Sequence, residues 1–539
     1  MTRSTDSTRS LDCGGDRAPD DPPTGTGANR HVPAAYAVPV AGLVVTIAAC
    51  ILLRAHLLPL GVPGQWYWPL RVTPLVPTLS MLQGLIIIVL AAAYIISILR
   101  LGARPAQVTL AVALCTLGCG AMMMGLYSTE RYGDLRTAQV TCSISALPYF
   151  GAAIEAGSLQ ALVDEYVKDY TRDAQPERLR THPPAATAYY LLARRAILGS
   201  EWLTNLARGL IARSGLPPEQ ANRLAIGRTA LKLTSDDVAA GTLASVFITL
   251  LGALTPAACF LLATAVLPLR HALQATLLSA VIPSLLIVAP SIEGVAVVLA
   301  LSGSGALLWA ARLATGTAEA PARRPVALAL ALLSGPLWAA AILWTVGLLA
   351  VALPVGAVLV RSLLVERDAR GATLLALGVA CAGFLGVHAV IYLVSGYSLP
   401  LHLMGIMSSQ RDIMAAAGRD RLTWTWMNLY DFALFLGPAL TIAAVAGTAR
   451  LVRSISTADA GAWLCLGGVA ALVLLDLSGT TRAEVGRIWV FLMPFFALTA
   501  TRAAWAESPP RGALGLGILT LAQVIYAVVL YASIVPVGV

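Results

Sequence analysis

The sequence predicts an all-α fold: a polytopic transmembrane helical bundle of about 12 to 13 spans, with an external loop carrying amphipathic juxtamembrane helices. Of its 539 residues, 58% are hydrophobic and only 12% are charged, and the mean hydropathy is +0.76. No water-soluble domain of this length tolerates such a composition on its surface. Apolar stretches of roughly 20 residues, the length that crosses a bilayer as a helix, recur along the chain. A helical bundle also satisfies the backbone in lipid, where an open sheet would not.

The predicted spans follow one another through a transmembrane domain covering 36–539. Residues 1–35 are polar and aperiodic, which predicts a disordered N-terminus, and they do not resemble a cleaved signal peptide. The stretch 326–362 is long enough for two crossings, with Pro336 and Pro354 as candidate breaks. The spans are 36–53, 80–99, 105–127, 239–267, 272–289, 293–311, 326–362, 371–395, 429–449, 461–477, 485–501 and 512–535.

Arginines between the spans predict the orientation. Arg100 and Arg104 lie in the tight connection between the second and third spans, which the positive-inside rule places in the cytoplasm. The N-terminus is then cytoplasmic, and 128–185 is a large external loop. Scarce lysine and abundant alanine suggest a GC-rich bacterial genome, and hence the plasma (inner) membrane. Arginines that flank apolar spans predict no nucleic-acid partner.

The same rule applied from the other end places two further loops on the external face. The basic connections 361–370 and 450–453 are predicted to be inside, so that 396–427 and 478–487 lie outside together with 128–185. With these three loops outside, the chain must cross the membrane an even number of times between His182 and Asp236. If 183–211 instead crosses once, Glu293 moves to the other side of the membrane.

The external loop 128–185 holds a large share of the charges in the chain. Its segment 152–170 has apolar residues at helical spacing and acids on the opposite side, which predicts a helix lying along the membrane surface. One interpretation is a solvated juxtamembrane helix. The other is a lid over a site at the membrane boundary, with Glu155 or Asp164 as the general base.

The fragment RTHPPAA (180–186) predicts a rigid corner, because two prolines fix consecutive φ angles and bias His182 towards an extended backbone. A turn alone is sufficient to explain it. In the functional interpretation, His182 exchanges a proton near neutral pH and Arg180 binds a phosphate or carboxylate.

Two further clusters carry candidate binding residues. In DLSGTTRAEVGRIWVFLMP (476–494), Glu484 and Arg487 share a helical face, so they either clamp the last helices together or leave Arg482 and Arg487 to bind a lipid-linked phosphate. In the segment 408–437, the tryptophans form an interfacial belt, or Trp424 stacks on a sugar while Asn428 and Asp431 form hydrogen bonds with its hydroxyls.

Several features recur together in this chain: the external acidic loop, T-H-P-P entering a helix, and A-P-S-I-E-G after a proline-containing helix (PSLLIVAPSIEG, 283–294). With these features the chain resembles the GT-C superfamily of integral-membrane glycosyltransferases. The runs NLYDF and RAEVGRIWVFLMP also look like late parts of such proteins. The similarity is greatest to members related to the dolichyl-phosphate-mannose and aminoarabinose transferases.

The resemblance implies transfer of a sugar from a polyprenyl-phosphate carrier to a glycan, lipid or protein acceptor on the outer face. The family usually has an acid early in the first large external loop; here Leu147 and Pro148 stand where an Asp is expected, and Glu155 is the next acid. Glu293 matches a second family acid and would support the pocket. No His, Asp or Glu spacing is diagnostic of a metal site, so the need for a divalent metal stays open.

Two rival functions remain open. One is a transporter or flippase for a lipid-linked sugar, which favours charges inside spans and paired broken helices. The other is a non-catalytic membrane scaffold, which the missing early Asp would explain.

Overall fold

The computed structural model describes residues 32–535 apart from 72–73, 131–132, 134, 144–145, 227–231, 316–322, 458 and 508. Over these residues the chain is almost wholly helical, which confirms the predicted fold class. A small antiparallel hairpin pairs β1 (Gly61–Val62) with β2 (Trp66–Tyr67). Of the segment predicted to be disordered, residues 1–31 lie outside the described residues.

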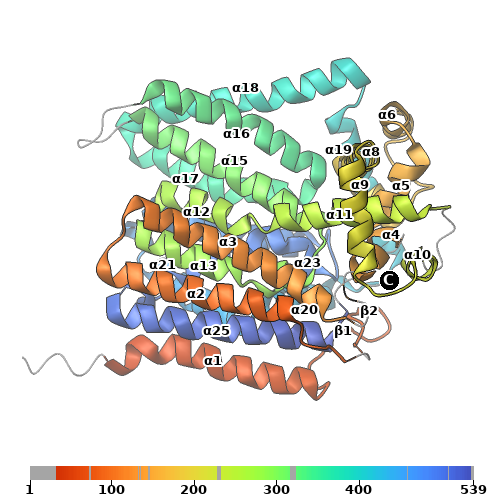
Figure 1. Ribbon diagram of the computed structural model, residues 1–539. Helices are drawn as coiled ribbons and strands as arrows, with labels where there is room; N and C mark the ends of the chain where they lie inside the picture. Colours follow the sequence, from red (N-terminus) through yellow and green to blue (C-terminus); the bar gives the residue numbers. More distant parts are fainter. Residues whose placement is uncertain are drawn as a thin grey trace, which may run out of the picture.

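Long apolar helices lie side by side and form the body of the molecule (Figure 1). Within the described residues, 11 stretches are long and apolar enough to cross a membrane, so the chain is a multi-pass membrane protein. These are α1 (Val32–Arg54), α2 (Leu79–Leu101), α3 (Pro105–Ser128), α11 (Ser235–Gly252) with α12 (Thr255–Val266), α13 (Leu269–Ala280) with α14 (Pro283–Ile287), α15 (Ile292–Thr315), α16 (Arg324–Trp344), η1 (Val346–Val351) with α17 (Ala352–Val365), η2 (Arg367–Ala369) with α18 (Arg370–Ser395), α22 (Ala460–Ser478) and α25 (Pro509–Ser533).

The predicted double crossing of 326–362 is confirmed, but the break falls at Thr345 and neither proline makes it. Pro336 lies inside α16, where α18 packs closely: a Cβ at the neighbouring Gly335 would lie 2.3 Å from the carbonyl oxygen of Ala380. Proline inside a membrane helix is tolerated where neighbouring helices support the backbone. Thr345 has an extended backbone and therefore ends the helix.

The predicted span 429–449 is divided in the structure. Helix α20 (Arg421–Leu436) and helix α21 (Pro438–Arg453) meet at 111°, with Gly437 at φ 92° between them. The Gly-Pro pair permits this bend, because only glycine readily takes a positive φ. The predicted span 485–501 is also segmented, into α23 (Val485–Ile488), η4 (Trp489–Leu492) and α24 (Met493–Ala500).

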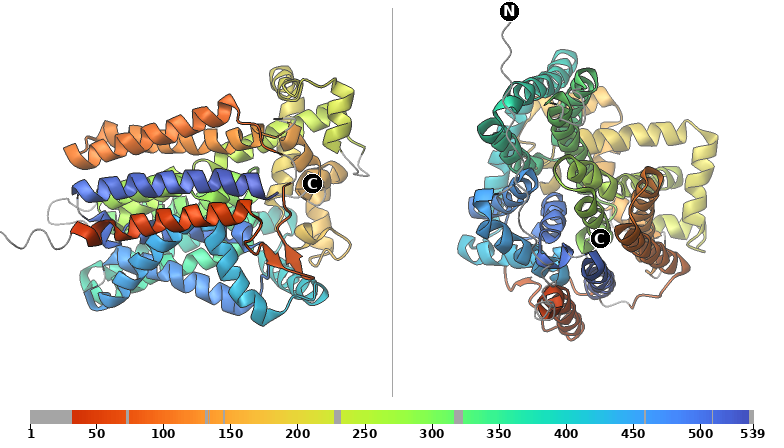
Figure 2. Two further views of the ribbon diagram at one scale, coloured as in Figure 1. Left: turned by 90° about the horizontal axis from the view of Figure 1, so that it is seen from below. Right: turned by 90° about the vertical axis from the view of Figure 1, so that its left-hand side faces the viewer.

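Short helices gather at the end of the bundle opposite the start of α1, and we call this group the cap (Figures 1 and 2). No candidate span lies among the described residues of 129–234, which is consistent with an even number of crossings between His182 and Asp236. The cap helices are α4 (Leu135–Cys142), α5 (Pro148–Ala156), α6 (Leu159–Lys168), α7 (Glu177–Arg180), α8 (Ala185–Leu198), α9 (Glu201–Ala212), α10 (Pro218–Ile226) and α19 (Leu399–Ala416).

The three loops predicted to share one face do meet in the cap. Ser409 Oγ donates to the carbonyl of Thr171 at 2.9 Å, and Gln410 Nε2 donates to the carbonyl of Thr480 at 2.9 Å. The single helix predicted over 152–170 is two helices, because Gly157 at φ 62° ends α5 and Ser158 caps the start of α6. The cap therefore joins segments from three distant parts of the chain.

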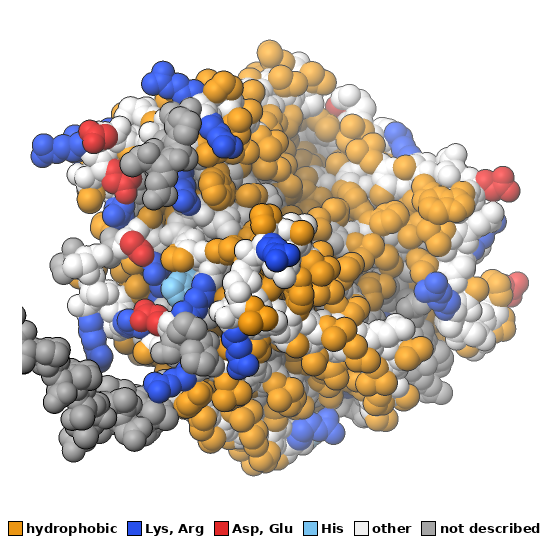
Figure 3. Space-filling model, turned by 60° about the vertical axis from the view of Figure 1, so that its left-hand side comes forward, with side chains coloured by type: hydrophobic (Ala, Val, Ile, Leu, Met, Phe, Trp, Pro, Cys, Tyr) orange, Lys and Arg blue, Asp and Glu red, His pale blue; other side chains and the backbone are white. Residues whose placement is uncertain are grey.

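The opposite end, where α1 begins, is rich in arginine, and we call it the basic end. It also includes η3 (Ile455–Thr457) and η5 (Ala504–Ala506). Figure 3 shows blue side chains gathered there beside a broad hydrophobic surface. The described charged residues at the helix ends and connections on this side are Arg100, Arg104, Arg270, Arg312, Arg323, Arg324, Arg361, Arg367, Arg370, Arg450, Arg453, Arg502 and Arg511, with Glu366, Asp368, Asp459 and Glu507.

Candidate active site

A small pocket lies where the cap meets the membrane helices. It spans about 270 Å³, part of it open to the surroundings, and is bounded by the loop before α5, by α7, by the start of α15 and by α23. A second pocket, of about 310 Å³, shares Val288, Ser291 and Arg487 with it and extends between the apolar helices. The polar lining of the first pocket comprises Tyr149, Arg178, Ser291, Glu293 and Arg487.

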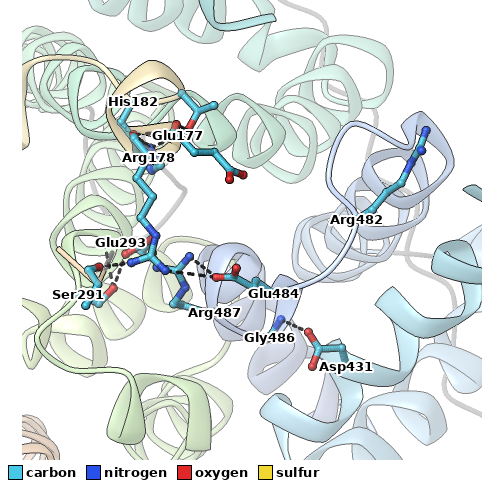
Figure 4. Close-up of polar contacts among 12 residues, drawn as sticks. Glu177, Arg178, His182, Ser291, Glu293, Asp431, Arg482, Glu484, Gly486 and Arg487 are labelled. Atoms are coloured by element: carbon cyan, nitrogen blue, oxygen red, sulfur yellow. Dashed lines mark hydrogen bonds and ion pairs between the residues drawn. The ribbon is translucent and has the colours of Figure 1, made fainter. Parts of the chain in front are cut away.

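Arg487 lies at the centre of the pocket's charges (Figure 4). Its Nη2 donates to Glu484 Oε2 at 2.6 Å, and its Nη1 lies 3.8 Å from Glu293 Oε1. The pairing of Glu484 with Arg487, predicted from their spacing, is confirmed. Glu293 is only 5% exposed, and Ser291 Oγ donates to its second oxygen at 2.5 Å. One guanidinium therefore holds two carboxylates from distant parts of the chain.

Arg178 and His182 approach the same pocket from the cap. Arg178 Nη2 lies 3.6 Å from Glu484 Oε2, and Arg178 Nη1 donates to the carbonyl of Ala146. His182 Nδ1 lies 2.8 Å from the Arg178 carbonyl, so that nitrogen carries the proton and Nε2 keeps its lone pair. RTHPPAA forms the predicted corner between α7 and α8. The corner thus fixes the backbone that presents Arg178.

The loop that presents Arg487 has an uncommon backbone. Ala483 and Glu484 both have positive φ angles, 82° and 57°, which non-glycine residues seldom adopt. Helix α20 holds this loop in place: Asn428 Oδ1 accepts from the Ala483 N–H at 3.2 Å, and Asp431 Oδ2 accepts from the Gly486 N–H at 2.8 Å. The packing of α20 therefore sets the position of Arg487.

Burial and neighbouring charges act together on the groups outside the apolar helices. Burial raises the pKa of the Tyr149 hydroxyl well above its ordinary value. Burial lowers the pKa of His182, against the opposing effect of Glu293, so the imidazole is neutral at pH 7. Burial tends to raise the pKa of Glu484, but Arg487 and Arg178 outweigh it, and the net pKa lies below the ordinary value. The site therefore carries ionised carboxylates and guanidinium groups.

The structure places several predicted site residues away from the pocket. Glu155 and Asp164 are exposed on α5 and α6, and Asp164 accepts from Gln160 at 2.6 Å. Arg180 pairs with the exposed Asp173 at 3.1 Å. Arg482 points away from Arg487 (Figure 4) and donates to the carbonyl of Arg419.

Trp424 and Asn428 also lie outside the pocket. Trp424 is 1% exposed, and its indole N–H donates to Gln65 Oε1 at 2.7 Å. Asn428 Nδ2 donates to Asp476 and to the carbonyl of Thr481. These groups are committed to internal contacts, so each holds the protein together and presents no open face to a sugar.

Sequence reasoning missed Arg178, Tyr149 and Ser291 as pocket residues. Arg178 stands four residues before His182, a spacing that would have placed both on one side of a helical turn. Ser291 precedes Glu293 by two residues in the A-P-S-I-E-G run and fixes its carboxylate. Nothing in the sequence around Tyr149, apart from the adjacent aromatic residue, indicated a role in a site, because the other pocket residues come from distant segments.

The side chains of this site can transfer a proton beside an anionic group that the guanidinium groups bind. Among the described residues there is no group of three or more His, Cys, Asp or Glu that could hold a metal ion. Two carboxylates, a neutral imidazole and two guanidinium groups are the charged and proton-transferring groups of the site. Comparisons with protein-family models, curated proteins and solved structures found no match.

Proposed function

We propose that this chain is a glycosyltransferase that moves a sugar from a polyprenyl-phosphate carrier to an acceptor at the cap end of the membrane. The observation that supports it best is Glu293, a buried carboxylate in a pocket with two guanidinium groups, where the apolar helices end. Transfer from a phosphate leaving group needs a base for the acceptor and cations for the phosphate.

Arg178 and Arg487 are the proposed phosphate ligands. Both now face the same oxygen of Glu484, at 3.6 and 2.6 Å. A phosphate presents more acceptor oxygens and more charge than a carboxylate, and guanidinium binds it through two parallel hydrogen bonds. The carrier phosphate is therefore expected to displace Glu484, while the polyprenyl chain stays among the apolar helices.

In the proposed step, Glu293 takes the proton of the acceptor hydroxyl or amine as that atom attacks the anomeric carbon. The bond between the anomeric carbon and the phosphate oxygen breaks, and its electron pair leaves with the polyprenyl phosphate. Attack opposite the leaving group inverts the anomeric configuration. The proposal moves the role of general base to Glu293 from Glu155 or Asp164, the two acids predicted for it from the sequence.

The test is sugar transfer by the full-length protein in proteoliposomes, with radiolabelled polyprenyl-phosphate sugars and an acceptor extract. We expect Glu293→Gln to lower the turnover number about 100-fold or more, because the general base is lost. Glu155→Gln is the matched control, since Glu155 is an exposed acid of the cap, and it should leave turnover unchanged.

Two results would contradict the proposal. The first is full activity of Glu293→Gln. The second is an absence of transfer from every donor tested, combined with movement of the carrier across the bilayer, which would favour a transporter for the lipid-linked sugar.

A further inference from the structure

A wide cavity lies at the basic end, on the far side of the membrane domain from the candidate active site. It encloses about 1030 Å³ of empty space, open to the surroundings, between the end of α15 and the starts of α16 and α18. Its walls are mostly alanine, glycine and leucine. A volume of this size is typical of a site for a small molecule or a lipid headgroup.

Two opposite charges line this cavity without partners. Arg324 and Asp368 both contribute to the wall, and neither side chain forms a hydrogen bond or ion pair with any described residue. Their neighbours are engaged: Arg312 donates to the Thr264 carbonyl at 3.1 Å, and Arg370 donates to the Leu363 carbonyl at 2.6 Å. The cavity therefore presents one free cation and one free anion to a ligand.

The cavity also lies at a membrane boundary. The candidate span Ile292–Thr315 ends at a lining residue, Arg324–Trp344 begins at one, and Arg367–Ser395 begins one residue before the lining residue Asp368. The adjoining faces of α16 and α18 are apolar and open to lipid: Leu328 is 40% exposed and Leu375 is 52% exposed. A ligand here meets charged groups at one end and a hydrocarbon surface at the other.

We propose that this cavity binds a phospholipid whose headgroup joins a phosphate to a primary amine. Arg324 holds the phosphate, since guanidinium suits phosphate oxygens, and the starts of two helices add favourable dipoles. Asp368 holds the ammonium group, and the acyl chains lie against Leu328 and Leu375. The site is separate from the proposed transferase chemistry and does not depend on it.

The test measures lipid retained by the full-length protein in detergent, by native mass spectrometry. The probes are phosphatidylethanolamine, phosphatidylglycerol and phosphatidylcholine with identical acyl chains. We expect Arg324→Gln to lower retention of all three about tenfold, because each loses a charge-assisted phosphate contact. Asp368→Asn should lower retention of phosphatidylethanolamine about tenfold and leave phosphatidylglycerol unchanged.

Two further variants complete the experiment. Arg367→Gln is the matched control, because Arg367 is an exposed arginine next to Asp368 that does not line the cavity, and it should change nothing. Ala372→Phe fills the cavity without a change of charge and should lower retention of all three lipids. Equal retention of phosphatidylethanolamine by wild type and Asp368→Asn would overturn the headgroup assignment. If glycerophosphoethanolamine, which has no acyl chains, displaces the lipid at equal concentration, the ligand is a free headgroup compound and not a phospholipid.

Discussion

Arg487 sets the charge balance of the candidate active site. Its guanidinium group lies between Glu293 and Glu484, and these three side chains are 11%, 7% and 24% exposed. A buried carboxylate is costly unless a cation and hydrogen bonds compensate for its lost hydration. Arg180, by contrast, pairs with an Asp173 whose side chain is 70% exposed, where water competes for both charges. Arg487 therefore contributes more to the stability of the fold than Arg180 does.

We expect Arg487→Ala to lower the free energy of unfolding by about 3 kcal/mol, because it leaves the buried Glu293 and the partly buried Glu484 short of a cation. Arg180→Ala should cost about 0.5 kcal/mol or less, as exposed ion pairs do. Thermal unfolding of the purified protein in detergent measures both. Equal losses from the two variants would contradict a stabilising role for the buried cluster.

At the scale of elements, the loop 479–486 owes its course to helix α20. Asn428 and Asp431 stand three residues apart on α20 and bond the backbone N–H groups of Ala483 and Gly486. Asp431 also accepts from the indole of Trp68, which ties the first hairpin to the same point. The early loop, α20 and α23 therefore form one unit around Arg487.

Gly486 is the tightest point of that unit. A Cβ there would lie 2.3 Å from Cδ2 of Phe435, a ring that is fully buried. We expect Gly486→Ala to destabilise the protein by about 2 kcal/mol, because the ring has no room to retreat. Gly378→Ala is the control, since a Cβ on Gly378 meets nothing within 4 Å. Equal changes in melting temperature for the two variants would show that the contact between Gly486 and Phe435 leaves room for a Cβ.

At the scale of the whole molecule, charge differs between the two ends. The cap mixes acids and bases, whereas arginines outnumber acids at the basic end (Figure 3). Positive charge in short connections is typical of the cytoplasmic side. We therefore infer that the basic end, from which α1 starts, faces the cytoplasm and that the cap with the candidate active site faces outward.

Cysteine labelling checks this orientation in a variant that lacks the native cysteines. Cysteines at Glu155 and Asp412, both exposed in the cap, should react with a membrane-impermeant maleimide added to intact cells. Cysteines at Arg104 and Arg367, both exposed at the basic end, should react only after permeabilisation. The reverse labelling pattern would show that the protein has the opposite orientation, with the candidate active site on the cytoplasmic side.

The sequence by itself determined the features that depend on short-range periodicity. Runs of apolar residues defined the spans, the two prolines after His182 defined the corner before α8, and the three-residue spacing of Glu484 and Arg487 defined their pairing. These follow from the length of a helix across a bilayer and from the rise of a helical turn, which neighbouring residues alone control.

Only the tertiary structure decided which of the charged residues meet. Glu293 and Arg487 are nearly 200 positions apart, as the numbering itself shows, and no local pattern links them or brings Arg178 to Glu484. The same packing took Trp424 and Asn428 into the interior and left Glu155 outside. Long-range contacts depend on how whole helices pack against one another, and that information is distributed over the entire chain.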